Sequence, residues 1–151
     1  MSSTSHGTVS AEQDLLLIGP DHLIVPLTAD LHYSSQDPYA VRISLDAGRD
    51  EPVKWSLCRD LLAAALHARQ GIGDVRAWPS PAPATLAELT ADTEEKILNI
   101  ELGPPDGYAR FEASATGIEA FLTRTYELVP AGQEPAFLNL DAELTELLSQ
   151  A

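Results

Sequence analysis

Alternation of apolar and polar residues is the feature of this sequence that most constrains its fold. It runs through three consecutive segments, at residues 23–33, 39–45 and 53–57. Because successive side chains of a strand point to opposite faces, each segment is predicted to form a strand with one face on a core. The connectors SSQDP and AGRDE are short and rich in turn-forming residues. Neighbouring strands must therefore be antiparallel, because a parallel return needs about a dozen residues.

The segments on either side of these three strands complete a first unit. LLLIG at 15–19 predicts a further strand before them. After these strands the apolar residues recur at helical spacing instead of alternating. The sequence GIG at 71–73 follows this segment, and glycine is common at a helix C-terminus. We therefore expect a four-stranded meander followed by a helix over about 58–69. The apolar stripe of that helix falls at Leu57, Leu61, Leu62, Ala65 and Leu66.

A second unit repeats this order of elements without detectable repetition of the sequence itself. Strands are predicted at 74–80, 96–102 and 108–114, the last two joined by the turn GPPDG. A helical face follows at Ile118, Phe121, Leu122, Thr125 and Val129. The sequence therefore predicts an α+β protein with a strands-then-helix pseudo-repeat of the ββββα type, with antiparallel sheets each followed by a helix.

The remaining segments are an N-terminal tail, a connection between two strands and a short C-terminal helix. Residues 1–8 are small and polar and are expected to form a disordered N-terminal tail, followed by a single domain over 9–151. The proline-rich, acidic stretch at 79–95 is expected to be a solvated excursion between strands. A stripe of leucines over 140–148 predicts a short C-terminal helix with acids in its first turn, where the helix dipole favours them.

Composition indicates a soluble protein of one domain. A chain of 151 residues is about one domain long, and no apolar run approaches the roughly 18 residues of a membrane-spanning helix. The single cysteine excludes an internal disulfide, which fits a reducing cytoplasm. The net charge of −14 repels the phosphates of nucleic acids, so nucleic acid is not an expected partner.

Cys58 is the first candidate for catalysis, because it precedes Arg59 at the predicted start of a helix. A helix N-terminus and a neighbouring arginine both favour a reactive thiolate. A thiol nucleophile also needs a base within hydrogen-bond reach. His67 is the nearest histidine in the sequence, and it lies roughly 13 Å along the same helix. A buried or half-buried structural cysteine is the favoured interpretation.

No other constellation for catalysis or cofactor binding stands out. One cysteine and four histidines form neither a two-cysteine cluster nor a histidine pair at helical spacing. We therefore expect no catalytic residue, no cofactor and no metal. Trp55 falls on the apolar side of its strand and is predicted to lie in the core. Trp78 has the opposite parity to Val75 and Ala77, so it is a candidate for a contact surface.

Three motifs of the sequence are specific enough to compare with known families: Asp-Pro-Tyr-Ala-Val, Arg-Asp-Leu-Leu and Gly-Asp-Val-Arg-x-Trp-Pro. They lie in four segments that resemble the SsgA-like proteins, a sporulation and cell-division family of actinomycetes. The likeness covers most of the chain from about Val9 to Leu148. The segments are DPYAVRISL at 37–45, RDLLAAALHARQGIGDVRAWPS at 59–80, FLTRTYELVPAGQE at 121–134 and LDAELTELL at 140–148.

The resemblance implies a non-enzymatic role in placing division septa, in which the protein helps to position or recruit the tubulin-like division protein FtsZ. It also implies a fold similar to the Whirly single-stranded-DNA-binding fold, with two sheets each followed by a helix, and a homo-oligomer, typically a trimer. FtsZ and other division or SsgA-like proteins are the implied partners, and cytoplasmic septum sites the implied location. The connection at 81–95 is longer than the family leads us to expect.

Five residues match the family's pattern and are candidates for partner binding: Arg59, Asp60, Arg76, Trp78 and Arg124. For Arg59 and Asp60, the simpler interpretation of a polar helix start is favoured. The alternative function left open is a single-stranded nucleic-acid binder, motivated by the Whirly-like architecture and the exposed polar face of the sheet. A thiol enzyme built on Cys58 comes third.

Overall fold

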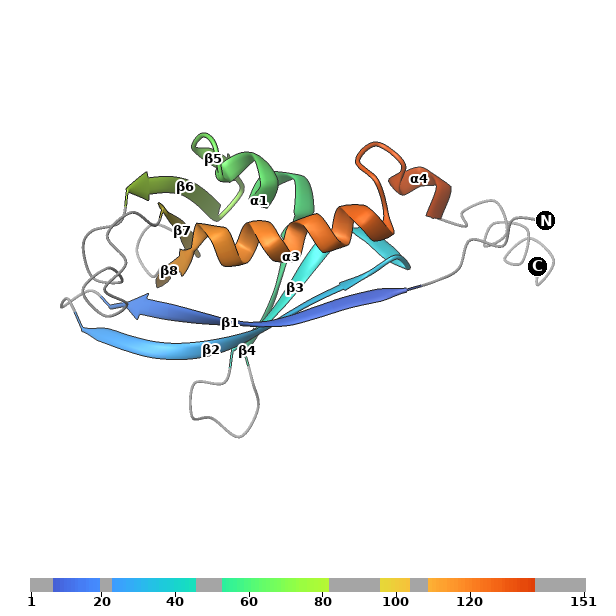
Figure 1. The fold of residues 1–151 in the computed structure, drawn as a ribbon. Helices are drawn as coiled ribbons and strands as arrows, with labels where there is room; N and C mark the ends of the chain where they lie inside the picture. The colour runs from blue at the N-terminus through green and yellow to red at the C-terminus, as the bar shows by residue number, and fades with distance from the viewer. Residues whose placement is uncertain (1–6, 20–22, 46–52, 82–95, 104–108, 138–151) are drawn as a thin grey trace, which may run out of the picture.

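The computed structural model describes residues 7–19, 23–45, 53–81, 96–103 and 109–137. Within these residues the elements run in the order of four strands, a helix, four strands and two helices (Figure 1). All eight strands belong to one sheet, in the order β4-β3-β2-β1-β8-β7-β6-β5. The protein is therefore of the α+β class, as the sequence predicts.

The first four strands form the predicted antiparallel meander: β1 (Thr8–Ile18), β2 (Ile24–Ser34), β3 (Asp37–Leu45) and β4 (Val53–Cys58). Only β1 departs from the prediction, because it begins at Thr8 and not near residue 15. Its early part continues the alternation, with Val9 opposite Tyr33 and Ala11 opposite Leu31 on β2. Thr8, the last residue of the expected tail, is thus the first residue of this strand.

The second meander contains β5 (Gln70–Ile72), β6 (Val75–Pro81), β7 (Lys96–Leu102) and β8 (Ala109–Ser114). Strand β5 is absent from the prediction, which continued the preceding helix to about residue 69. That helix, α1, spans only Arg59–Ala65. The glycines of GIG do not cap it, since Gly71 lies in β5 and Gly73, with a φ of 59°, makes the tight β5–β6 turn.

The two meanders are one sheet, which corrects the expectation of two. Strand β1 pairs with β8 in an antiparallel register that runs from Leu15 opposite Ala113 to Ile18 opposite Arg110. The sheet curls around the helix that follows β8 (Figure 1). Trp55 of β4 and Phe111 of β8 consequently meet edge to face, with ring centroids 5.6 Å apart, although three strands separate β4 from β8.

Helix α3 (Ala115–Leu128) covers the inner face of the sheet and packs on β1, β7 and β8. Ser114 caps its start, and the Oγ atom accepts a hydrogen bond of 3.2 Å from the Gly117 backbone N–H. The predicted apolar face of this helix is confirmed, because all five of its residues are buried. A short helix that was not predicted, α4 (Glu134–Phe137), follows it. The predicted helix at 140–148 lies outside the described residues, and so does the predicted connection at 79–95 except for its first three residues, which belong to β6.

The sheet has two unlike faces. We call the face under α1 and α3 the helix face, and it holds the main apolar core, including Leu31, Ile43 and Ala113. Trp55 lies half-buried against this core, as predicted. We call the opposite face the open face, and it takes the alternate residues of every strand. In the middle of β2, β3 and β4 the open face is polar: Asp30, His32, Arg42, Ser44, Lys54 and Ser56.

Candidate functional site

Arg59 is the most deeply buried charged residue of the described part of the chain. Its side chain is 1 % exposed at the start of α1, where it lies on the helix face two residues after Leu57 of β4. The interpretation of Arg59 as part of a polar helix start is therefore wrong. An arginine at this depth cannot contact a partner protein directly, so it acts through the residues that surround it.

Three carbonyl or carboxylate groups accept hydrogen bonds from the two Nη atoms of Arg59, while its buried Nε atom has no hydrogen-bond partner. The Nη1 atom donates to the Thr125 carbonyl at 3.1 Å and to the Val129 carbonyl at 2.8 Å, and both carbonyls belong to the end of α3. The Nη2 atom donates to Glu134 Oε1 at 2.7 Å. The arginine thus caps the C-terminus of α3, where the helix dipole favours a cation, and ties α4 to α1.

Two tyrosine rings flank the same guanidinium. Its central carbon lies 4.0 Å from the Tyr126 ring centroid and 4.9 Å from the Tyr33 ring centroid. The Tyr126 hydroxyl donates to Asp60 Oδ1 at 2.8 Å, and the Tyr33 hydroxyl donates to the Pro38 carbonyl at 2.9 Å. We call the set formed by Arg59, Tyr33, Thr125, Tyr126, Val129 and Glu134 the Arg59 cluster.

The protonation states in the cluster follow from burial and from these contacts. Burial raises the pKa of Tyr33 to about 12 and the pKa of Tyr126 further, so both hydroxyls keep their protons. Hydrogen bonds lower the pKa of Glu134, first from its own backbone N–H and then from Arg59, and they outweigh the effect of burial. The result is a buried ion pair between one arginine and one carboxylate, which holds elements together and offers no site for chemistry.

The other four candidate residues do not gather at one place. Asp60 is exposed and joins the rim of the Arg59 cluster through Tyr126. Arg76 and Trp78 share the open face of β6, where Arg76 pairs with Glu101 at 3.1 Å and the ring of Trp78 lies 4.9 Å from the Arg69 guanidinium.

Arg124 lies apart from these residues on the exposed side of α3. It donates to the Ser10 carbonyl at 3.2 Å, which ties the helix to the start of β1.

Cys58 is exposed, which contradicts its prediction as a buried or half-buried residue. It ends β4 with the parity of Lys54 and Ser56, so the pleat turns it to the open face. Its exposure alone does not give it a function. No group of three or more histidine, cysteine or acidic side chains suitable for a metal ion occurs among the residues described.

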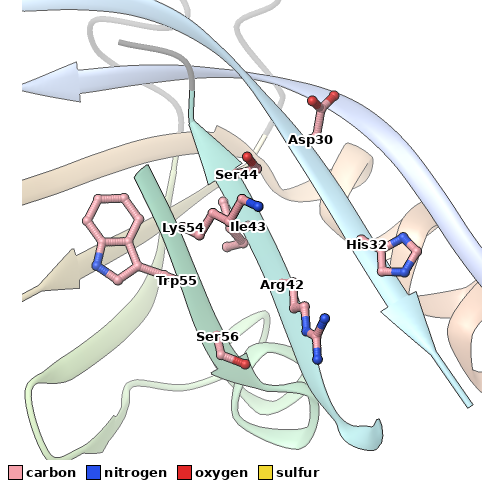
Figure 2. A pocket seen from close by; sticks show the side chains of 8 residues that line it. All are labelled: Asp30, His32, Arg42, Ile43, Ser44, Lys54, Trp55 and Ser56. Atoms are coloured by element: carbon pink, nitrogen blue, oxygen red, sulfur yellow. The ribbon is translucent and has the colours of Figure 1, made fainter. Parts of the chain in front are cut away.

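A hollow on the open face is the feature that sequence reasoning missed. It has a volume of about 510 Å³ and lies over β2, β3 and β4 (Figure 2). We call it the open-face hollow. Figure 2 shows its polar side chains on one side of the three strands, while Trp55 projects past the free side of β4. The residues that line it are Asp30, His32, Arg42, Ile43, Ser44, Lys54, Trp55 and Ser56.

The strand register arranges the polar residues of the hollow in two neighbouring rows. One row runs across the strands from Asp30 to Ser44 to Lys54, and the other from His32 to Arg42 to Ser56. Each row therefore carries one cation, on β3 or on β4. Alternation had already placed these residues off the core, but only the register shows that they are neighbours.

The cations of the hollow are weakly engaged. Arg42 is 66 % exposed and lies 3.7 Å from Asp37, a pair that contributes little in water. Lys54 has no ion pair within the described ranges. Arg59, Arg76 and Arg110, in contrast, each pair with a carboxylate at 3.4 Å or less. The hollow thus holds two exposed cations beside one lining carboxylate, Asp30, on a protein with a net charge of −14.

Comparison with known proteins connects this fold to cell division. The model of a family described as "Streptomyces sporulation and cell division protein, SsgA" matches residues 27–134. The sporulation-specific cell division protein SsgB of Thermobifida fusca is 46 % identical over 97 % of this chain and 99 % of its own length. SsgB of Streptomyces coelicolor is 39 % identical over 95 % of this chain and 98 % of its own length.

Two solved structures share the fold. A crystal structure of an SsgA-like sporulation-specific cell division protein from Thermobifida fusca superposes with a TM-score of 0.80 at 45 % identity, over 97 % of this chain and 98 % of that one. A structure from a study of SsgB mutations and longitudinal cell division in Streptomyces coelicolor gives a TM-score of 0.76 at 38 % identity, over 91 % of this chain and all of that one. The chain therefore belongs to the SsgA family of sporulation and cell division proteins.

Proposed function

We propose that this protein acts in sporulation-linked cell division by helping to position or recruit FtsZ at septum sites, as a binding protein without catalytic activity. The near full-length likeness to SsgB proteins, which are sporulation-specific cell division proteins, carries the proposal. The geometry is in keeping with it, because the buried polar groups of the Arg59 cluster are used for holding elements together. Two exposed cations, Arg42 and Lys54, lie instead on the open face.

The partner surface is proposed to comprise the open face and the exposed candidates Asp60, Arg76, Trp78 and Arg124. Arg59 leaves this set as a direct contact, because only 1 % of its side chain is exposed. It is a positioning residue, since it holds α1 against the end of α3 and so fixes the places of Asp60 and Arg124. Half-buried Trp78 beside Arg76 has the aromatic and cationic character common at binding surfaces.

Three further features belong to the same proposal. The two successive units of four strands and a helix support the Whirly-like classification that the sequence resemblance implies. A homo-oligomer, with a trimer as the expected form, also follows from that resemblance. Concentration at cytoplasmic septum sites would follow from FtsZ binding. No helix in the described ranges has the length and apolar character to cross a membrane.

We do not retain single-stranded nucleic-acid binding as the preferred function. The open face carries Glu12, Asp14 and Asp30 beside the two cations of the hollow. These carboxylates repel a phosphate backbone that follows the sheet, and the net charge of −14 adds to the repulsion. The Whirly-like analogy is an argument from fold alone.

Co-sedimentation of the purified full chain with polymerising FtsZ from the same organism tests the proposal. The protein is expected to pellet with the polymer at low and moderate salt, and to stay in the supernatant when FtsZ is kept unpolymerised or left out. Retention in the supernatant under all of these conditions would contradict a direct FtsZ role. Normal septation in a deletion strain would contradict the division role as a whole.

A further inference from the structure

The free edge of β4 is the first of two observations that point to one kind of partner. Strand β4 ends the sheet order, and β3 is its only neighbour among the described strands. In an antiparallel pair, the backbone groups of alternate residues point away from the partner strand. The outer side of β4 therefore offers hydrogen-bond donors and acceptors that an added strand could use.

The positive charges beside this edge determine which kind of strand can pair with it. Lys54 lies on the edge strand itself, and Arg42 lies one strand further in. A lysine on an edge discourages pairing with a second cationic strand and favours an acidic one. Among the described residues, Lys54 forms no ion pair, and its exposed ammonium group can accept an incoming carboxylate as a partner.

The spacing of the two cations suggests the sequence pattern of the partner. Lys54 and Arg42 lie in neighbouring cross-strand rows, two residues apart along the strands, which corresponds to about 7 Å. Alternate residues of an added strand have the same spacing and face the same side. Carboxylates at every second position would therefore match both rows. The residues between them would face Trp55, whose half-buried ring projects past the edge of β4 (Figure 2).

We propose that β4 and the open-face hollow bind an extended partner segment in which acidic and apolar residues alternate, and that this segment adds to the sheet beside β4. Its acidic side chains reach Lys54 and Arg42, and its apolar side chains contact Trp55. The inference deepens the proposed function and rests on it in one respect only, that the segment belongs to a division protein. The binding chemistry itself does not depend on which protein supplies the segment.

Solution NMR on the isotope-labelled full chain tests the proposal with a defined probe. The probe is an eight-residue capped peptide, Thr-Glu-Val-Glu-Val-Glu-Val-Thr, titrated to millimolar concentration at low salt. We expect shifts of the β3 and β4 amides and of the Trp55 indole N–H. Binding should weaken about fivefold in Lys54→Glu and about tenfold or more when Arg42→Glu is added. Lys96→Glu, an equal charge change on an exposed strand residue, should bind as the parent does.

Further probes distinguish the pattern from charge alone. A peptide of the same composition with its three glutamates consecutive should bind about threefold more weakly, because its carboxylates no longer share one side of a strand. A lysine-for-glutamate peptide should not bind. Tighter binding of the parent peptide than of a ten-residue oligothymidylate supports the protein-segment assignment, and binding of the oligothymidylate at least as tightly would overturn it in favour of nucleic acid.

Three other results would also overturn the proposal: no shift at millimolar peptide, shifts confined to other strands, or the same shifts produced by raising the protein concentration alone. The last would assign the edge to a second copy of this chain. Failure of the two proposals is separable. Peptide binding without FtsZ pelleting removes the FtsZ role and keeps the site, whereas FtsZ pelleting without peptide binding keeps the role and removes the site.

Discussion

The Arg59 cluster and the open-face hollow use the same kind of side chain for opposite purposes. Arg59 is 1 % exposed and makes three hydrogen bonds to the end of α3 and to α4. Arg42 is 66 % exposed, and its closest carboxylate is 3.7 Å away. A buried cation that is held by several hydrogen bonds stabilises the fold, while a weakly paired cation on the surface is available to a partner.

The two regions should also differ in how much stability is lost when a cation is replaced. Removing Arg59 would leave the buried Glu134 carboxylate without its cation and the Val129 carbonyl without its donor, while the Thr125 carbonyl would keep the hydrogen bond from the Val129 N–H. Removing Arg42 or Lys54 would leave only groups that water already solvates. Stability should therefore respond strongly to the Arg59 cluster and weakly to the hollow, and binding should respond in the opposite order.

The largest expected effect is that of Arg59→Met. We expect it to lower the free energy of unfolding by about 3–5 kcal/mol, because Glu134 becomes an unpaired buried carboxylate. Arg76→Met is the matched control, since Glu101 is partly exposed and the cost should stay near 1 kcal/mol or below. Urea unfolding measures both. Similar losses in the two variants would remove the contrast between buried and exposed arginines.

Glu134→Gln should lower the free energy of unfolding by about 1.5–3 kcal/mol at neutral pH. The reason is that Arg59 then donates its hydrogen bond to a neutral amide and no longer to a charged carboxylate. The pKa of Glu134 in the folded protein lies below its ordinary value of 4.5, so the ionised carboxylate contributes stability above that pH. This contribution is lost as the pH falls through the folded pKa.

Urea unfolding between neutral pH and pH 3 checks the titration. The parent protein should lose its advantage over Glu134→Gln as the solution becomes acidic below about pH 4.5. A gap between the two proteins that stays constant down to the lowest pH would show that Glu134 does not titrate as the geometry requires.

Tyr126→Phe should have a smaller effect, of about 0.5–1.5 kcal/mol, since it removes only the hydrogen bond to Asp60. The ring that lies 4.0 Å from the Arg59 guanidinium remains. Tyr126→Leu removes the ring as well and should cost about 0.5–2 kcal/mol more. Thermal unfolding of the two variants separates these contributions. Equal losses would mean that the ring contact with Arg59 contributes nothing.

The smallest stability effects are expected in the hollow. Lys54→Glu and Arg42→Glu should each change the free energy of unfolding by no more than about 0.5 kcal/mol, because both side chains are solvated and neither is held by a short ion pair. Urea midpoints measured beside those of the Arg59→Met variant check this. A loss above 2 kcal/mol would mean that the hollow, too, serves the fold.

Local patterns in the sequence predicted most of the strands but not how they join. Alternation identified β2, β3 and β4, since one face of each lies on the core. It missed β5, because three residues around Gly71 carry too little pattern. The pairing of β1 with β8 has no local signature, as it joins Leu15 to Ala113 across most of the chain. Two expected sheets therefore became one.

The site was the harder part to predict. Arg59 was placed on the surface because it begins a helix, yet it follows Val53, Trp55 and Leu57 in the same alternation and so continues to the helix face. Its partner Glu134 lies 75 residues further on, which no spacing rule connects. Cys58 has the opposite parity, which explains its exposure. The hollow depends on strand register, which alternation within one strand does not determine.

The exposed cations of the hollow are expected to bind a partner, whereas the buried Arg59 stabilises the fold. Co-sedimentation with polymerising FtsZ tests this claim most directly when the double variant Arg42→Glu/Lys54→Glu is compared with the parent protein and with Lys96→Glu. We predict that the parent and Lys96→Glu pellet with the polymer, while the double variant stays in the supernatant with an unchanged urea midpoint. Equal pelleting of all three proteins would contradict the claim, and so would a double variant that fails to pellet only because it has unfolded.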